Sequence, residues 1–214
     1  MPARLASFVL LATSATVAHA ADEAASTPGA DAAPEKAWSF ALTAYPTAVR
    51  GGEDYTSAIA TADRASLHLE ARYNYESIGA RSAYVGWTFA GGDSLAWQVT
   101  PIVGGAWGTT QSFVAGVEAS LAWRAIDFYI EAEYVPTRTR GESYTYAWSE
   151  LGFRAAPWLR IGVVGQHTRT YGGEREFQRG PFAQVTWSAV TIGGYWFNPG
   201  ADDQVFVAAL GVKF

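Results

Sequence analysis

The last ten residues of the chain alternate in hydrophobicity with a period of two. From Val205 to Phe214, one set of alternate positions is large and apolar and ends in Phe214, whereas the other set is smaller and ends in Lys213. This period is typical of a β-strand whose two faces meet different surroundings. The sequence therefore predicts a terminal strand with one apolar and one more polar face.

The same alternation recurs from Trp38 onward, with turn residues between the segments, and helical periodicity is nowhere sustained. The predicted strands cover residues 38–45, 55–61, 66–75, 82–89, 95–103, 111–123, 127–135, 143–154, 158–170, 177–187, 190–197 and 204–214. Twelve strands are the first prediction. Segment 55–61 has the weakest pattern, and losing it together with one other strand gives ten as the alternative. Pro101 lies within the predicted strand 95–103 but cannot donate a hydrogen bond to a neighbouring strand. We therefore expect it near the outer rim of the sheet or at a bulge.

The first twenty residues have the pattern of a secretory signal. Arg4 precedes an apolar stretch, and Ala18-His19-Ala20 forms a cleavage site. Residues 21–36 are rich in Ala, Pro and acids, and lack bulky apolar side chains, so we expect a disordered leader. The barrel domain is predicted over residues 37–214. No later stretch approaches the roughly 20 apolar residues of a transmembrane helix, and the absence of cysteine excludes a disulfide framework.

Aromatic residues gather at both ends of the predicted strands. They make up 14% of the chain, whereas charged residues are 16%, against roughly 25% in ordinary soluble domains. One set falls at the end where the C-terminus lies: Trp38, Phe89, Trp123, Phe128, Trp158, Trp187 and Phe214. The other set falls at the opposite end: Tyr75, Trp107, Tyr134, Tyr171 and Trp196. Rings at both ends favour a membrane barrel with interfacial belts, while a soluble lipocalin-like barrel with an aromatic core is the alternative.

The connections between the predicted strands also differ between the two ends. Short turns at residues 91–92, 124–125, 155–157 and 188–189 share the end of the C-terminus. Longer and more highly charged connections lie at the other end, at residues 50–54, 76–81, 137–142, 171–176 and 198–203. Outer-membrane barrels have short periplasmic turns and longer extracellular loops.

Together, the signal segment, the aromatic placement, the loop asymmetry and the strand ending in Phe214 resemble Gram-negative outer-membrane β-barrel proteins of the small porin-like class, over residues 38–214. The resemblance implies an all-β, antiparallel, up-and-down transmembrane barrel in the cell outer membrane. It also implies contact with outer-membrane lipids and lipopolysaccharide, and recognition of the terminal strand, with Phe214 as assembly signal, by the barrel-assembly machinery. The sequence carries no nucleic-acid-binding pattern.

In a membrane barrel the apolar strand face meets lipid and the polar face is enclosed. The predicted lumen-lining residues are Glu70, Arg72, Gln98, Glu118, Glu131, Glu133, Glu150, Arg160, Gln166, Gln184 and Lys213. One interpretation is that these charges pair with one another and with inner tyrosines, which would plug a closed structural barrel. The other is a narrow water-filled path whose carboxylates favour cations. The first functional hypothesis is a porin-like channel for small solutes or ions, and the second is a closed barrel without transport.

Five arginines cluster toward the predicted outer rim: Arg138, Arg140, Arg169, Arg175 and Arg179. Guanidinium groups bind phosphate bidentately, so these residues are candidates for contact with lipopolysaccharide. A solvated loop of mixed charge is the alternative, because acidic residues lie between them.

A third hypothesis is an outer-membrane hydrolase. His68 and His167 are the histidines beyond the signal segment, and neither has the neighbouring serine and asparagine, or the aspartate, of known barrel hydrolases. Both are interpreted as polar strand residues, and no catalytic residue is predicted. No metal-ligand spacing or phosphate-binding glycine motif is present, so the sequence predicts no cofactor and no metal site.

Overall fold

The computed structural model describes residues 37–136, 143–171 and 175–214. The predicted signal and leader segments, with Arg138 and Arg140, lie outside these ranges. The described residues form thirteen strands: β1 Ser39–Val49, β2 Tyr55–Arg64, β3 Leu67–Tyr73, β4 Arg81–Trp87, β5 Phe89–Gly91, β6 Ala96–Trp107, β7 Ser112–Trp123, β8 Ile126–Val135, β9 Tyr144–Ala156, β10 Leu159–Thr170, β11 Arg175–Trp187, β12 Val190–Phe197 and β13 Val205–Lys213. The described residues contain no helix that is long and apolar enough to cross a membrane.

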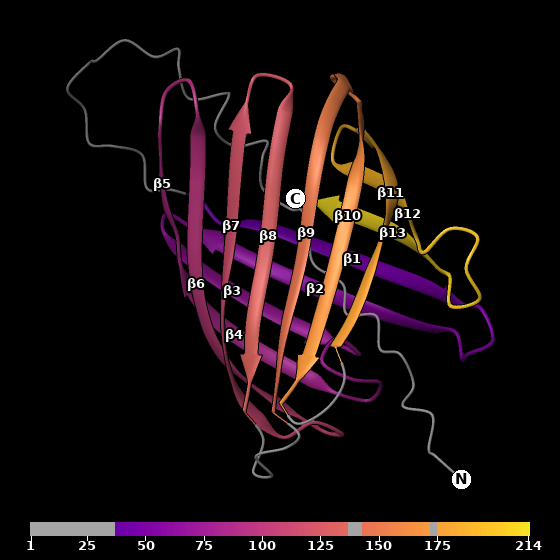
Figure 1. Cartoon of the computed structure of the whole chain (residues 1–214). Helices are drawn as coiled ribbons and strands as arrows, with labels where there is room; N and C mark the ends of the chain where they lie inside the picture. The colour runs from indigo at the N-terminus through magenta and orange to yellow at the C-terminus, as the bar shows by residue number, and fades with distance from the viewer. Residues whose placement is uncertain (1–36, 137–142, 172–174) are drawn as a thin grey trace, which may run out of the picture.

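The strands form a closed antiparallel barrel (Figure 1). Neighbours in the chain pair with one another, β1 pairs with β13, and β4 pairs with β6. The short strand β5 continues β4, since Gly86 lies opposite Ile102 and Phe89 opposite Val99 in one unbroken register. The ring therefore has twelve strands with β5 as an extra segment. This confirms the predicted all-β barrel and the weak strand 55–61, and excludes the alternative of ten.

Pro101 lies in the middle of β6, so its predicted place at the rim or at a bulge was wrong. The ladder between β6 and the β4–β5 strand is interrupted beside Pro101, between the pairs Gly86–Ile102 and Phe89–Val99. The register does not shift there, because the proline only removes a hydrogen-bond donor. The hydroxyls of Thr88 and Thr100 lie 3.0 Å apart across this gap.

The two ends of the barrel have different connections. Tight hairpins close one end, at residues 65–66, 124–125, 157–158 and 188–189, and three of them lie at the top of Figure 1 with the β5–β6 hairpin. We call this the short-turn end. Ala65, Arg124 and Ser188 have a positive φ at the first turn position. The longer segments 50–54, 74–80 and 198–204 lie at the other end, the long-loop end.

Terminal residues close the seam between the first and last strands. Phe40 and Phe214 exchange backbone hydrogen bonds of 2.8 and 3.0 Å, and their rings stack with centroids 5.8 Å apart. The seam then continues through the register of β1 with β13, from Ala41–Lys213 to Val49–Val205. The terminal strand is therefore a wall element of the barrel.

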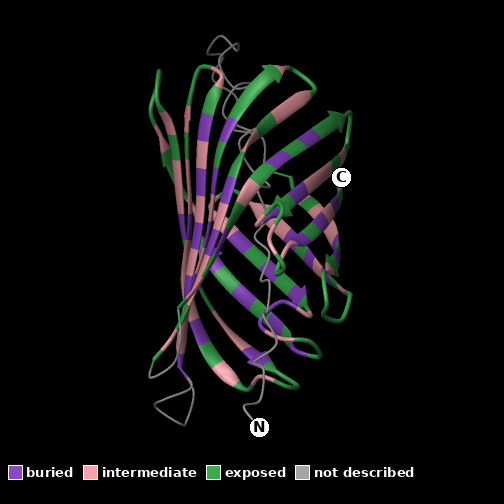
Figure 2. Cartoon of the chain, turned by 45° about the vertical axis from the view of Figure 1, so that its right-hand side comes forward, coloured by how far each residue is buried: buried purple, intermediate pink, exposed green. Residues whose placement is uncertain are grey.

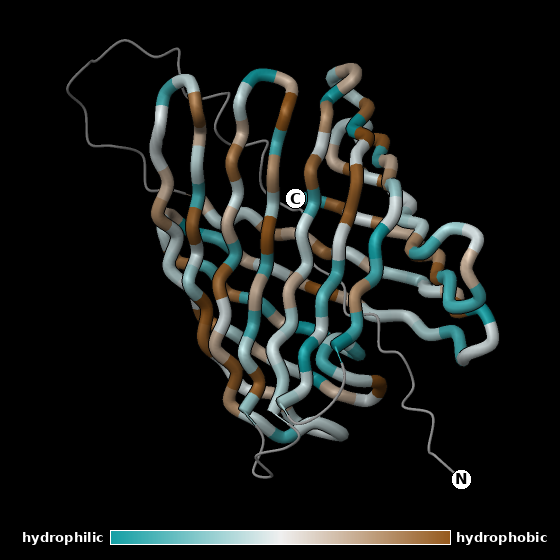
Figure 3. The backbone as a smooth tube through the Cα atoms, in the orientation of Figure 1, coloured by the Kyte–Doolittle hydropathy of each residue, from teal (hydrophilic) through white to brown (hydrophobic). Residues whose placement is uncertain are grey.

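Burial alternates along the strands, as Figure 2 shows. The exposed set is apolar and includes Leu69, Val85, Phe113, Leu151, Val163, Ile192, Phe206 and Leu210. The buried set holds most of the acidic strand residues, and hydrophilic and hydrophobic positions are mixed along the strands in Figure 3. A soluble barrel would show the reverse arrangement, because its apolar face would form the core. The apolar exterior and the hydrogen-bonded ring together satisfy the two requirements for spanning lipid.

The rings of both predicted aromatic belts are exposed, with two exceptions. Phe128 is only half-buried, and Tyr75 is buried inside the barrel, so its predicted place in the outer belt was wrong. The strand pattern that placed Tyr75 outside ends at Tyr73, and Asn74 takes a positive φ of 54°. The alternation of faces does not continue through such a turn.

Candidate functional site

The enclosed face of the barrel carries the candidate functional residues. Among the residues predicted to line the lumen, the buried ones are Glu70, Arg72, Glu118, Glu131, Glu133, Glu150, Gln166 and Gln184. Gln98 and Arg160 are half-buried, and Lys213 is exposed at the short-turn end. The structure thus brings acidic side chains from β3, β7, β8 and β9 into one enclosed space.

Arg72 is the centre of the first ion-pair network, which we call the Arg72 network. Its Nε donates to Glu70 on the same strand, and its Nη1 donates to Glu133 Oε1 at 2.6 Å. The same Nη1 lies 3.0 Å from Glu131 Oε1. Since β3 and β8 are separated by β4, β6 and β7 along the wall, these contacts cross the interior of the barrel.

Tyrosines complete the Arg72 network. The Tyr75 hydroxyl donates to Glu131 at 2.8 Å, and the Tyr84 hydroxyl donates to Glu76 at 2.6 Å. The guanidinium carbon of Arg72 lies 4.2 Å from the Tyr75 ring centroid and 4.4 Å from that of Tyr84. A cation between two rings is held by their negative faces as well as by its carboxylates.

Arg160 is the centre of a second network, toward the short-turn end. It donates to both oxygens of Asp127 from Nε, to Glu150 Oε2 at 2.5 Å and to Gln184 Oε1 at 2.9 Å. Gly152 makes room for it, because a Cβ at that position would lie 2.5 Å from Arg160 Nε and 2.7 Å from the Asp127 carboxylate. Asp127 was not among the predicted lumen residues, because it stood at the first position of a predicted strand and its face was not assigned.

Between the two networks lies a layer of aromatic rings. Trp148 donates to Glu150 at 3.0 Å and packs edge-on against Tyr195 and Phe197, with centroids 5.2 and 5.4 Å away. The Tyr195 hydroxyl also donates to Glu150, at 2.9 Å. These inner aromatics were missed as lumen residues, although Trp148 shares the strand face of Glu150 and that parity was a usable signal.

The middle of the lumen is closed by these side chains. Glu131 and Trp148 are 0% exposed and Arg72 is 3% exposed. A small cavity of about 50 Å³ opens beside Lys213, Thr191 and Gln184 near the short-turn end. The barrel interior is therefore a constriction formed by two arginine networks and an aromatic layer, with its mouth at the short-turn end.

The constriction carries more negative than positive charge. Glu70, Glu131 and Glu133 share the single guanidinium of Arg72, and one oxygen of Glu133 has no hydrogen-bond partner among the described residues. One oxygen of Glu118 is likewise buried without a partner. Rings of carboxylates of this kind favour cations in channels.

Three of the five candidate rim arginines lie in the described ranges. Arg169 and Arg175 are register partners where β10 and β11 meet the long-loop end. Arg179 lies further along β11 on the same strand face as Arg175. All three are exposed. Arg169 packs over Tyr171 and Arg179 over Phe177, at 5.7 and 6.0 Å from the ring centroids.

Searches against protein-family models and against curated proteins found no match. Comparison with solved structures found the KdgM porin in complex with disordered oligogalacturonate, with a TM-score of 0.59, 8% identity and coverage of 81% of this chain and 98% of that chain. A second structure of the KdgM porin matches with a TM-score of 0.54 and 9% identity over 81% and 98% of the two chains. The Acinetobacter baumannii outer membrane protein Omp33 matches with a TM-score of 0.48 and 13% identity over 83% and 98%.

Proposed function

We propose that the chain is a porin-like channel of the Gram-negative outer membrane that passes small cations through an acidic constriction. The observation that carries this proposal is that the barrel has an apolar exterior and a charged interior, the opposite of the arrangement in a soluble barrel. The shared fold with the KdgM porin supports it. In this orientation the short-turn end faces the periplasm and the long-loop end faces outward.

The sign of the cargo follows from the interior charge. Glu118, Glu131 and Glu133 outnumber the one arginine that they surround. A cation that enters this region is attracted by the carboxylates that Arg72 does not neutralise. An anion is repelled by them, and the low dielectric constant of the interior strengthens both effects. The oligogalacturonate in the matched KdgM complex is a polyanion, and the acidic constriction argues against a cargo of that charge here.

Because the constriction is closed at mid-height, passage requires its side chains to move. The contacts that close it include ion pairs and hydrogen bonds across the interior, such as Arg72–Glu133 and Tyr75–Glu131. These can rearrange without breaking the backbone ladder. We therefore expect a small conductance that depends on the Arg72 network.

Planar-bilayer recording in a salt gradient tests this proposal. The purified chain should give discrete current steps with a reversal potential that indicates cation preference. In Glu131→Gln/Glu133→Gln the preference should fall, because two carboxylates at the constriction lose their charge at almost constant shape. Glu53→Gln, an exposed acid in the segment before β2, is the matched control and should leave the reversal potential unchanged. A folded barrel that gives no current steps is the closed structural barrel and contradicts the proposal.

We further propose that Arg169, Arg175 and Arg179 contact lipopolysaccharide phosphates at the outer rim. Their exposure and their placement on two neighbouring strand ends support this role. Arg169→Gln/Arg175→Gln should lower the amount of lipopolysaccharide that copurifies with the barrel, measured by phosphate content. Unchanged copurification would assign these residues to a solvated rim.

A further inference from the structure

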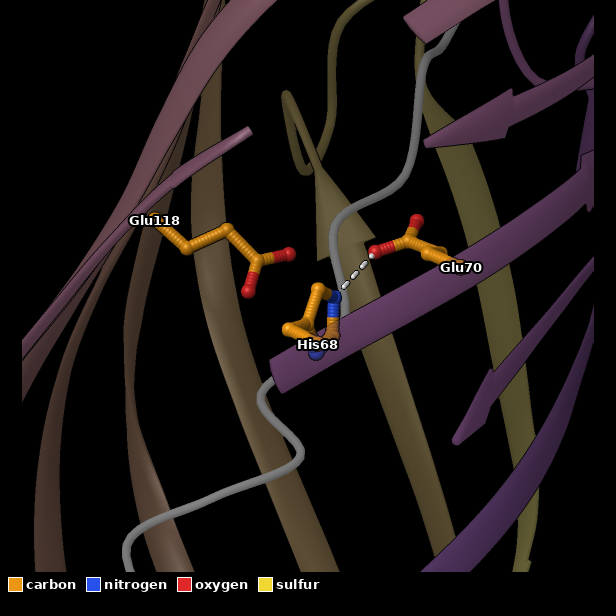
Figure 4. A group of neighbouring side chains, drawn as sticks. All are labelled: His68, Glu70 and Glu118. Atoms are coloured by element: carbon orange, nitrogen blue, oxygen red, sulfur yellow. Dashed lines mark hydrogen bonds and ion pairs between the residues drawn. The ribbon is translucent and has the colours of Figure 1, made fainter. Parts of the chain in front are cut away.

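We propose that His68, Glu70 and Glu118 form a binding site for a divalent transition-metal ion, with Zn²⁺ as the representative, inside the barrel. This goes beyond the proposed conduction and does not depend on it. One nitrogen of His68 and one carboxylate oxygen from each glutamate lie within 4.8 Å of one another, and all three residues are buried. Figure 4 shows the Glu118 carboxylate extending from β7 into the interior toward His68 and Glu70.

The histidine is oriented as a metal ligand is. Its Nδ1 lies 2.7 Å from Asp63 Oδ1, and its Nε2 lies 3.2 Å from Glu70 Oε2. With the proton on Nδ1, the ring donates to Asp63 and directs the Nε2 lone pair at Glu70. A carboxylate that fixes the tautomer of a ligating imidazole is the usual outer partner in such sites.

In that tautomer His68 Nε2 and Glu70 Oε2 are two acceptors that face each other, and a metal ion between them would bind both lone pairs. Ligands about 2.0–2.1 Å from a tetrahedral zinc ion are separated by roughly 3.3 Å. The 3.2 Å between His68 Nε2 and Glu70 Oε2 matches that separation. Glu70 can supply this oxygen because its other oxygen, Oε1, already accepts from Arg72.

Glu118 provides the independent observation. Its side chain comes from β7, it is 9% exposed, and its Oε1 has no hydrogen-bond partner among the described residues. Arg72, the cation at the centre of the Arg72 network, already contacts Glu70, Glu131 and Glu133. A buried carboxylate without a counter-charge is unfavourable, so Glu118 is available as the third ligand.

The short-turn end gives the ion a route to the site. Asp63, in contact with His68, has a side chain that is 37% exposed. An imidazole with two carboxylates suits zinc and neighbouring ions, whereas Ca²⁺ and Mg²⁺ prefer sites made only of oxygen.

The test is isothermal titration of the untagged chain in detergent micelles with Zn²⁺, and with Co²⁺ as the spectroscopic probe. One ion per chain should bind. His68→Ala and Glu118→Gln should abolish this binding, and Asp63→Asn should weaken it about 10- to 100-fold as an outer-partner change. His167→Ala is the matched control and should bind as the unchanged chain does. A heat-dependent gel shift verifies that each variant is folded.

X-ray absorption of the zinc-loaded unchanged chain needs no variant and should show one imidazole among oxygen ligands. Absence of stoichiometric binding, a spectrum without imidazole, or binding that survives in folded His68→Ala would each overturn the proposal. Absence of binding would leave the contacts of His68 with Asp63 and Glu70 as structural contacts within the barrel wall. That result would leave the proposed channel untouched, because conduction is measured separately.

Discussion

At the scale of single residues, Arg72 determines whether the interior charges are compensated. It contacts Glu70, Glu131 and Glu133 and lies between two tyrosine rings. Removing one partner of a buried ion pair costs about 3–5 kcal/mol, because the remaining charges stay buried. We expect Arg72→Met to lower the free energy of unfolding by about this amount, measured by urea titration in micelles.

The control for Arg72→Met is Arg154→Met, since Arg154 is exposed and its side chain has no contact of this kind among those the structure describes. Arg154→Met should unfold at nearly the same urea concentration as the unchanged chain. Equal midpoints for Arg72→Met and Arg154→Met would show that the Arg72 network does not stabilise the fold.

Trp148 blocks the middle of the lumen. It is 0% exposed and packs on Tyr195 and Phe197. Trp148→Ala should increase the single-channel current, because it removes the largest ring from the constriction, and should cost about 3–5 kcal/mol of stability. Bilayer recording measures the first effect and urea titration the second. Trp187→Ala is the control, because Trp187 is 84% exposed at the short-turn end. A single-channel current that is unchanged in both variants would contradict the assignment of the constriction.

At the residue level, the sequence indicates which side chains share a face where strand parity continues, and it does not do so where the parity is interrupted. Glu131 and Glu133 were placed by counting alternate positions along one uninterrupted strand, β8. Tyr75 was misplaced because Asn74 turns the chain, and a single positive φ leaves no reliable trace in composition. The His68–Glu118 proximity could not be predicted, since it depends on which walls face each other across the barrel.

At the scale of elements, the terminal strand closes the ring. Phe214 pairs with Phe40 through two backbone hydrogen bonds and a stacked ring contact. We propose that Phe214 is also the assembly signal, read before the seam exists. Phe214→Ala should therefore lower the amount of folded barrel in the outer membrane, measured by the heat-dependent gel shift of membrane fractions.

Phe206→Ala is the matched control, because Phe206 is an exposed phenylalanine on the same strand. It should give a folded fraction close to that of the unchanged chain. Equal losses in both variants would assign Phe214 an ordinary role in lipid contact.

Element boundaries were predicted less well than element number. All twelve strands were identified from period two, yet β1, β2 and β6 each run past their predicted ends. Small residues such as Gly104 and Gly105 in β6 weaken the apparent pattern, although backbone pairing continues through them. The extension of β2 brings Asp63, which lies outside the predicted strand 55–61, into the sheet opposite His68.

At the scale of the whole molecule, the central claim is that the apolar face of the barrel meets acyl chains. The exposed strand face carries side chains such as Val163 and Ile192, while most of the acidic strand residues are enclosed. Twelve strands in a closed ring satisfy the backbone without water. Fold and orientation were predictable because alternation, loop asymmetry and aromatic placement all indicate the same arrangement, whereas the packing of the interior was not.

The most direct test uses the absence of cysteine from the chain, which allows single spin labels without background. A label at Val163→Cys, on the exposed face of β10, is compared in lipid vesicles with one at Glu53→Cys outside the strands. The account predicts that relaxation at position 163 responds to oxygen and hardly to a water-soluble nickel chelate, with the opposite result at position 53. A label at position 163 that responds to the nickel chelate as strongly as position 53 would contradict the account.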